Sequence, residues 1–105
     1  MARVFLSLGS NMGDRAATIS QAVSLLSMSD KINIIKTSSF YETEPWANKN
    51  QGWFVNAAIA IDTDFSAMEL LKYCQSVEAE LGRIRKQGEK WGERTLDIDI
   101  LMYDD

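Results

Sequence analysis

A chain of 105 residues fits one small domain, because it is too short to build a second hydrophobic core. Its formal net charge of −4 argues against broad nucleic-acid binding, which depends on neutralising many phosphates. The chain has no histidine and a single cysteine, Cys74, which excludes a histidine-built zinc site, a Ser-His or Cys-His catalytic pair and an internal disulfide.

Apolar runs are short throughout the chain. None approaches the roughly 20 residues that a membrane-spanning helix needs. The N-terminal run MARVFLSLGSN is too short to act as a signal peptide. We therefore expect a single cytoplasmic domain over residues 1–105, without a membrane partner.

The first third of the chain predicts a strand followed by a helix. Alternating apolar residues indicate a strand over residues 3–8 that Gly9 ends. Asp14 is a candidate N-cap for a helix that runs to about residue 28. The core stripe of this helix is expected to contain Ile19, Val23 and Leu26.

The middle of the chain predicts two further strands, at residues 32–41 and 53–62. Between them, the polar sequence ETEPWANKNQG breaks the regular pattern and carries Trp46, either a binding lid or a local clasp. In the second of these strands Val55, Ala57, Ile59 and Ile61 share one face. Asn56 lies on the other face, as a structural hydrogen bonder or as a reader of a heterocycle edge.

A capping box, Ser66-Ala67-Met68-Glu69, predicts that a second helix starts at Ser66, with Phe65 stapling its entry and Gly82 ending it. Its expected core stripe is Leu70, Leu71, Cys74, Val77 and Leu81. This places Cys74 in the packing rather than in catalysis. On one flank, Gln75 and Glu78 either are solvated or face a site.

The last stretch, GRIRKQGEKWGERTLDIDILM, combines cations with a paired-acid strand. Strand alternation places Asp97 and Asp99 together on one face, roughly 7 Å apart at Cα. Such a pair suits Mg²⁺, which prefers carboxylates combined with substrate phosphates. Trp91 offers a flat face to a ring. The cations that could hold phosphate oxygens are Arg83, Arg85, Lys86, Lys90 and Arg94. The alternative is a solvated charged loop before an edge strand with two exposed acids.

The predicted order strand, helix, strand, strand, helix, strand is typical of a ferredoxin-like α+β fold, in which two helices cover one face of an antiparallel sheet. The helices should cover Val4, Leu6, Val55, Ile59, Leu96 and Ile98. The uncovered face would carry Phe5, Phe54, Ala58, Ala60 and Leu101. If the chain ends at Asp105, that apolar face predicts self-association.

Four segments, taken in this order and spacing, carry a family resemblance: LGSN at 8–11, SSFYETEP at 38–45, FVNAA at 54–58, and GRIRK through WGERTLDIDIL. The chain resembles the 6-hydroxymethyl-7,8-dihydropterin pyrophosphokinases of folate biosynthesis. That resemblance implies transfer of diphosphate from MgATP to a pterin alcohol, giving AMP. Both substrates are small molecules, so no nucleic-acid partner is implied.

The resemblance also implies roles for particular residues. The two acids, Asp97 and Asp99, would bind two Mg²⁺ ions that bridge the ATP phosphates. The pterin would be held by Thr43, Pro45, Trp46, Phe54, Asn56 and Trp91. The nucleotide and the catalytic loop would involve Gln75, Glu78, Arg83, Arg85, Trp91, Arg94 and Ile98. Arg83, Arg85 and Arg94 would also steady the negative charge that develops during transfer.

Family members continue beyond the acidic strand, so one alternative is a truncated, weakly active or inactive module that binds pterin or nucleotide. Another is a ferredoxin-like RNA-binding domain, which also displays aromatics on an open sheet. Against the RNA-binding alternative, Asp97 and Asp99 lie where phosphates would be repelled.

Overall fold

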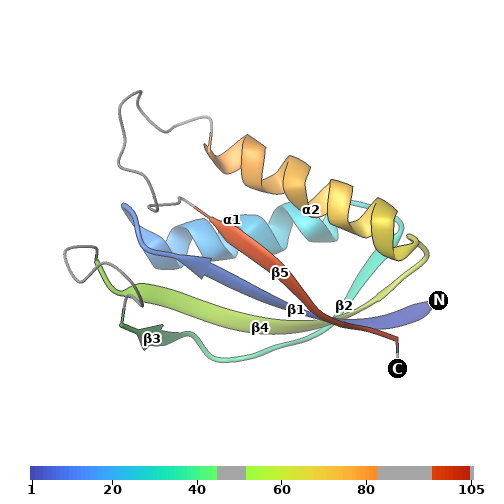
Figure 1. Cartoon of the computed structure of the whole chain (residues 1–105), viewed down its shortest axis with the longest axis horizontal. Coiled ribbons are helices and arrows are strands. Elements are labelled where there is room, and N and C mark those ends of the chain that lie inside the picture. The colour runs from blue at the N-terminus through green and yellow to red at the C-terminus, as the bar shows by residue number, and fades with distance from the viewer. Residues whose placement is uncertain (45–51, 83–95, 105) are drawn as a thin grey trace.

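The computed structural model describes residues 1–44, 52–82 and 96–104. Two helices lie side by side on one face of an antiparallel sheet, and the opposite face is uncovered among these residues (Figure 1). The elements are β1 (Ala2–Ser10), α1 (Arg15–Ser27), β2 (Ile32–Thr37), β3 (Tyr41–Thr43), β4 (Phe54–Thr63), α2 (Ala67–Gly82) and β5 (Asp97–Tyr103).

The strands are ordered β2-β4-β1-β5, and the short β3 pairs separately with the first residues of β4. Every pairing is antiparallel. This order, with the alternation of strands and helices along the chain, confirms the predicted ferredoxin-like α+β fold. The central strands β4 and β1 are the longest, so they form the support on which residues from the shorter strands are placed.

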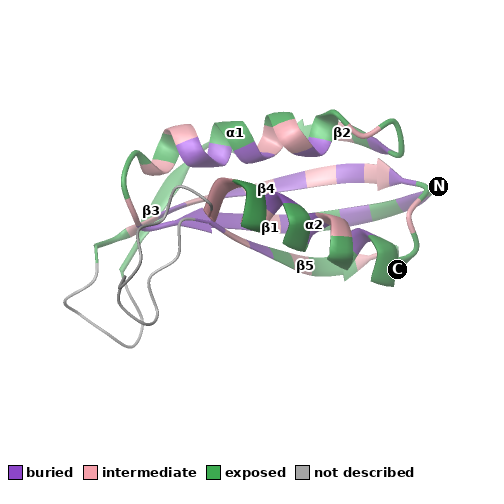
Figure 2. Cartoon of the chain, turned by 90° about the horizontal axis from the view of Figure 1, so that it is seen from above, coloured by how far each residue is buried: buried purple, intermediate pink, exposed green. Residues whose placement is uncertain are grey.

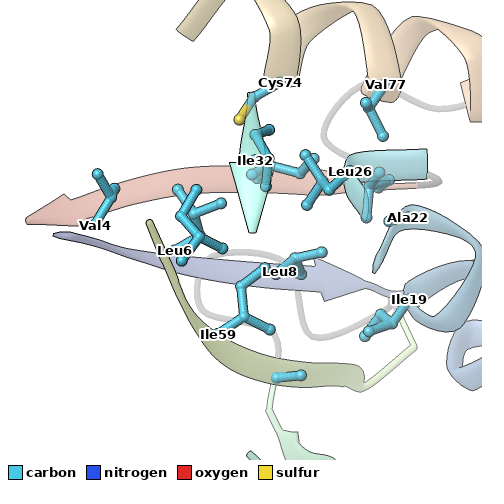
Figure 3. Close-up of a cluster of buried hydrophobic side chains, with 14 of the residues drawn as sticks. Val4, Leu6, Leu8, Ile19, Ala22, Leu26, Ile32, Ile59, Cys74 and Val77 are labelled. Atoms are coloured by element: carbon cyan, nitrogen blue, oxygen red, sulfur yellow. The ribbon is translucent and has the colours of Figure 1, made fainter. Parts of the chain in front are cut away.

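Strand alternation divides β4 into two faces. Val55, Ala57, Ile59 and Ile61 are buried under the helices, whereas the residues between them are only half-buried. The helices turn their buried sides toward the sheet (Figure 2). Figure 3 shows part of the core that results, including Val4, Leu6, Leu8, Ile19, Leu26 and Ile59. The prediction of Leu71 in this core was wrong, because its side chain is 38% exposed.

Both predicted helix starts are confirmed by their capping bonds. The Asp14 carboxylate accepts the Ala17 N–H at 3.2 Å. In the capping box, Glu69 accepts the Ser66 N–H at 2.9 Å, and Ser66 Oγ accepts the Glu69 N–H at 3.2 Å. The predicted anchor Phe65 stacks on Tyr73, with ring centroids 5.4 Å apart. The chain's local chemistry therefore sets where each helix begins.

Two predicted strand boundaries were wrong. The first strand does not end at Gly9 but continues through Ser10. The predicted strand over 32–41 is divided into β2 and β3, because Ser38 Oγ accepts the Ala58 N–H at 2.9 Å in place of a strand carbonyl. Its hydroxyl also donates to the Ser39 carbonyl at 2.8 Å. This interruption lets β3 begin anew beside the start of β4.

None of the helices within residues 1–44, 52–82 and 96–104 is long and apolar enough to cross a membrane.

Candidate functional site

The strand register aligns four residues in one row across the sheet. Tyr41 of β3 is opposite Asn56 of β4, Asn56 is opposite Gly9 of β1, and Gly9 is opposite Asp97 of β5. Directly paired residues share a face of a sheet, so this row lies on the face away from the helices. Two strand spacings put Asn56 and Asp97 roughly 10 Å apart at Cα. A ring held at one and phosphates held at the other would be neighbours.

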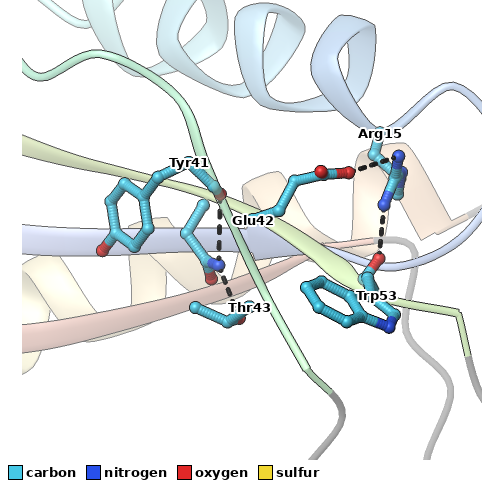
Figure 4. Close-up of polar contacts among 6 residues, drawn as sticks. Arg15, Tyr41, Glu42, Thr43 and Trp53 are labelled. Atoms are coloured by element: carbon cyan, nitrogen blue, oxygen red, sulfur yellow. Dashed lines mark hydrogen bonds and ion pairs between the residues drawn. The ribbon is translucent and has the colours of Figure 1, made fainter.

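Asn56 is held by its neighbours on the same face. Its Nδ2 donates to Thr43 Oγ1 at 2.8 Å and approaches the Tyr41 carbonyl at 3.5 Å (Figure 4). A Cβ added at Gly9 would lie only 2.9 Å from Asn56 Oδ1 and 3.6 Å from the Phe54 ring. Gly9 therefore leaves the space that Asn56 occupies, which explains a glycine inside a strand. Three predicted pterin residues, Thr43, Phe54 and Asn56, are brought together here.

The two acids of β5 lie on the same face, as predicted. Asp97 is half-buried and Asp99 is exposed, and Asp99 is opposite Ser7. Among the residues that the structure describes, no cluster of three or more acidic, cysteine or histidine side chains forms a metal site. The donor set is thus two carboxylates on one face. Such a set fits Mg²⁺, which commonly takes one or two protein carboxylates and completes its shell with phosphate oxygens and water.

The last turns of α2 reach the outer edge of β5. Glu78 accepts the backbone N–H of Ile98 at 2.8 Å, so a carboxylate satisfies an amide that the edge strand would otherwise leave open. The Ile98 side chain is buried toward the helices and does not share the face of the two acids. Gln75 is exposed one turn earlier on α2. Of the predicted nucleotide residues, Glu78 and Ile98 are therefore brought into contact.

Eight predicted site residues lie outside the described part of the chain: Pro45, Trp46, Arg83, Arg85, Lys86, Lys90, Trp91 and Arg94. The described residues that flank both gaps lie at one end of the sheet, where β3 and α2 end and where β4 and β5 begin (Figure 1). This is the same end at which Asn56 and Asp97 lie.

Cys74 is confirmed as a packing residue. It is 1% exposed and belongs to the core beneath α2. Burial, reinforced by the negative charge of Glu78, raises the pKa of the Cys74 thiol to about 11. A thiol with this pKa stays protonated at neutral pH and is a poor nucleophile.

Sequence reasoning missed one contact near the site, made by Arg15. Its Nη1 donates to the Trp53 carbonyl at 2.6 Å and its Nη2 to Glu42 Oε2 at 3.1 Å (Figure 4). A signal was present in the sequence, because a cation in the first turn of a helix opposes the helix dipole and needs another reason to be there.

A family model described as 7,8-dihydro-6-hydroxymethylpterin-pyrophosphokinase matches residues 5–104. The chain belongs to this family. The match includes every described residue of the row from Tyr41 to Asp97. It confirms the resemblance that the four sequence segments indicated.

Curated members of the pyrophosphokinase family match almost the whole chain. The 2-amino-4-hydroxy-6-hydroxymethyldihydropteridine pyrophosphokinase of Methylorubrum extorquens is 46% identical over 99% of this chain and 65% of the relative. The Bacillus subtilis protein of the same name is 43% identical over 94% and 58%, respectively. The Aquifex aeolicus protein is 44% identical over 100% and 63%. The chain thus spans about three fifths of the length of these relatives.

Proposed function

We propose that this chain contributes the site that transfers diphosphate from ATP to 6-hydroxymethyl-7,8-dihydropterin, giving AMP and the pterin diphosphate in folate biosynthesis. The observation that carries the proposal is the row across the open face, in which Gly9 separates Asn56 from Asp97. Membership of the pyrophosphokinase family supplies the substrates that such a row would serve.

The pterin side of the proposed site is the corner where β3 meets β4. Asn56, fixed by Thr43, presents an amide that can read ring nitrogen and oxygen atoms, and Phe54 provides an apolar wall beside it. Pro45, Trp46 and Trp91 are proposed from the sequence to complete this pocket. A flat heterocycle could lie over Gly9, where the strand carries no side chain.

The phosphate side of the proposed site is the beginning of β5, at Asp97 and Asp99. Asp97 and Asp99 would hold Mg²⁺, with two ions proposed, and a bound ion there would neutralise phosphate oxygens and orient the chain of phosphates. Arg83, Arg85 and Arg94 are proposed to steady the charge that develops on AMP and on the transferred group. Gln75, Glu78 and Ile98 would line the nucleotide side together with Trp91.

The chemistry requires no protein nucleophile. The hydroxymethyl oxygen of the pterin attacks the β-phosphorus of ATP, the bond from that phosphorus to the oxygen bridging to the α-phosphate breaks, and AMP leaves with that oxygen. The hydroxyl proton passes to solvent or to a nearby base. Transfer of this kind depends mainly on positioning and charge neutralisation. A chain without histidine and with a buried, protonated Cys74 can therefore support it.

We further propose that residues 1–105 act as one domain and work in the cytoplasm. The hydrophobic core that the described residues form, shared by both helices and the sheet, supports one domain. Cys74 is free and buried, which is compatible with a compartment that keeps thiols reduced.

The test is production of AMP by the purified protein from ATP and 6-hydroxymethyl-7,8-dihydropterin with Mg²⁺ present. We expect AMP and pterin diphosphate in equal amounts, with little AMP when the pterin is omitted. Binding of both substrates without AMP formation would instead support the alternative of a binding module. Failure to bind the pterin would contradict the proposal.

A further inference from the structure

Arg15 joins three segments that are distant in the sequence. It is the first residue of α1, and its guanidinium bonds to Glu42 in β3 and to the backbone carbonyl of Trp53 just before β4. The Arg15 side chain is 32% exposed and that of Glu42 is 56% exposed. The ion pair is therefore partly shielded from solvent on the arginine side.

Each of these bonds ends at a residue next in sequence to a proposed pterin-binding residue. Glu42 directly precedes Thr43, and Trp53 directly precedes Phe54. Thr43 in turn holds the Asn56 amide at 2.8 Å. A change in the position of β3 relative to β4 would therefore alter the geometry of Thr43, Phe54 and Asn56 at once.

The direction of the contact suits a positioning role. Glu42 is opposite the buried Val55, so its side chain points toward the helix side of the sheet, where α1 lies. Tyr41 and Thr43 point to the open face. Arg15 thus holds β3 from the helix side of the sheet, through the two bonds drawn in Figure 4.

Among the described residues, the short strand β3 is held by its pairing with β4 and by the contacts of Asn56 with Thr43 and Tyr41, besides the Arg15–Glu42 pair. β3 contains three residues, all exposed, and it pairs with only three residues of β4. A strand this short separates readily from its neighbour, because few hydrogen bonds and little apolar burial oppose the separation. The location of Arg15 at a helix N-terminus, where a cation is unfavourable, also indicates that its partner rather than its helix accounts for it.

We infer that Arg15 is a positioning residue for the pterin pocket: through Glu42 and the Trp53 carbonyl it fixes β3 against β4, and so fixes the Thr43–Asn56 pair. This inference rests on the proposed function. Arg15 does not touch the substrates. Its effect should be confined to the pterin side, because Asp97 and Asp99 lie on β5, two strands away from β4.

The test compares pterin and ATP affinity in the natural gene product and in Arg15→Ala, measured separately by calorimetry. We expect the dissociation constant for the pterin to rise about tenfold, the effect of losing bonds to a charged group. The constant for ATP with Mg²⁺ should change less than twofold. Arg15→Lys can keep one of the two bonds, so its pterin dissociation constant should lie between those of the natural protein and Arg15→Ala. Glu42→Gln should reproduce part of the loss of pterin affinity.

Arg3→Ala is the matched control. Arg3 of β1 pairs with Asp62 of β4 at 2.5 Å, at the opposite end of the sheet from Asn56. It should leave both affinities unchanged. Equal losses of pterin and ATP affinity in Arg15→Ala, or the same pterin loss in Arg3→Ala, would overturn the positioning role. So would unchanged pterin affinity in both Arg15 variants. If the natural protein itself binds no pterin, the proposed function fails, and this inference fails with it.

Discussion

The two faces of β4 differ in burial and in the residues that they contact. On the helix side, Val55, Ala57 and Ile59 are buried and make the core. On the other side, Phe54 and Asn56 are half-buried and meet residues of β3 and β1. Alternation along this one strand thus places core residues on one face and proposed site residues on the other. Substitutions on the two faces should accordingly affect different measurements.

The largest expected effect on activity comes from the acids of the open face. Asp97→Ala or Asp99→Ala should lower turnover about a thousandfold or more, because each removes a proposed metal ligand. The unfolding midpoint should hardly change, since neither side chain fills the core. Rates of AMP formation and denaturant melts measure the two effects. Asp64→Ala, an exposed acid at the other end of β4, is the control, and near-normal activity of Asp97→Ala would refute the metal assignment.

The helix side should show the reverse pattern. Ile59 is 2% exposed, so Ile59→Ala should lower the free energy of unfolding by about 2–5 kcal/mol, whereas Ile59→Val should cost about 1 kcal/mol. Urea denaturation measures both. While the variants remain folded, the Michaelis constants for both substrates should stay near those of the natural protein. A selective loss of pterin affinity in Ile59→Val would mean that the two faces are not independent.

Gly9→Ala tests the open face without removing any group. The added methyl would lie 2.9 Å from Asn56 Oδ1, so the amide must rotate away. We expect the Michaelis constant for the pterin to rise several-fold while the free energy of unfolding changes by about 1 kcal/mol. Gly13→Ala, with open space around it but a φ of 62°, is a control that strains the backbone without touching Asn56. Equal pterin effects in the two variants would argue against the close approach at Gly9.

The smallest expected effect concerns the buried thiol of the core. Folding raises the pKa of Cys74 from 9.0 to about 11, so the unfolded chain loses its thiol proton at lower pH than the folded chain does. This contribution to stability is complete below pH 9 and is lost as pH rises from about 9 to 11. Cys74→Ala should therefore flatten the decline of the unfolding free energy in this range. An unchanged pH profile would show that Cys74 is not the group responsible.

Local signals were enough to predict much of this fold. The caps at Asp14 and Ser66 depend on residues within one helical turn, and the alternation of β4 depends on its own side chains. The boundaries that failed depend on partners distant in the sequence. The strand continues through Gly9 because Gly9 pairs with Asn56 on one side and with Asp97 on the other, and the division at Ser38 depends on Ala58.

The candidate site shows the same division. Alternation alone predicted that Asp97 and Asp99 share a face, and the resemblance supplied Thr43, Phe54 and Asn56 as a group. The register that aligns Asn56 with Asp97 through Gly9 could not be derived from any one segment. Arg15 was missed for the same reason, since its two partners lie 27 and 38 residues away.

The side-chain amide of Asn56 gives the most direct test of the central claim, that the open face over Gly9 receives the pterin. Its NH₂ resonances can be followed by ¹⁵N NMR while 6-hydroxymethyl-7,8-dihydropterin is added to the natural protein, with Asn56→Asp used to assign them. The account predicts that these signals shift and saturate with the pterin, together with the amides of Gly9 and Thr43. The contradictory result is saturable pterin binding that leaves the Asn56 signals unchanged and shifts residues of the groove between the helices, such as Ser24 and Leu81.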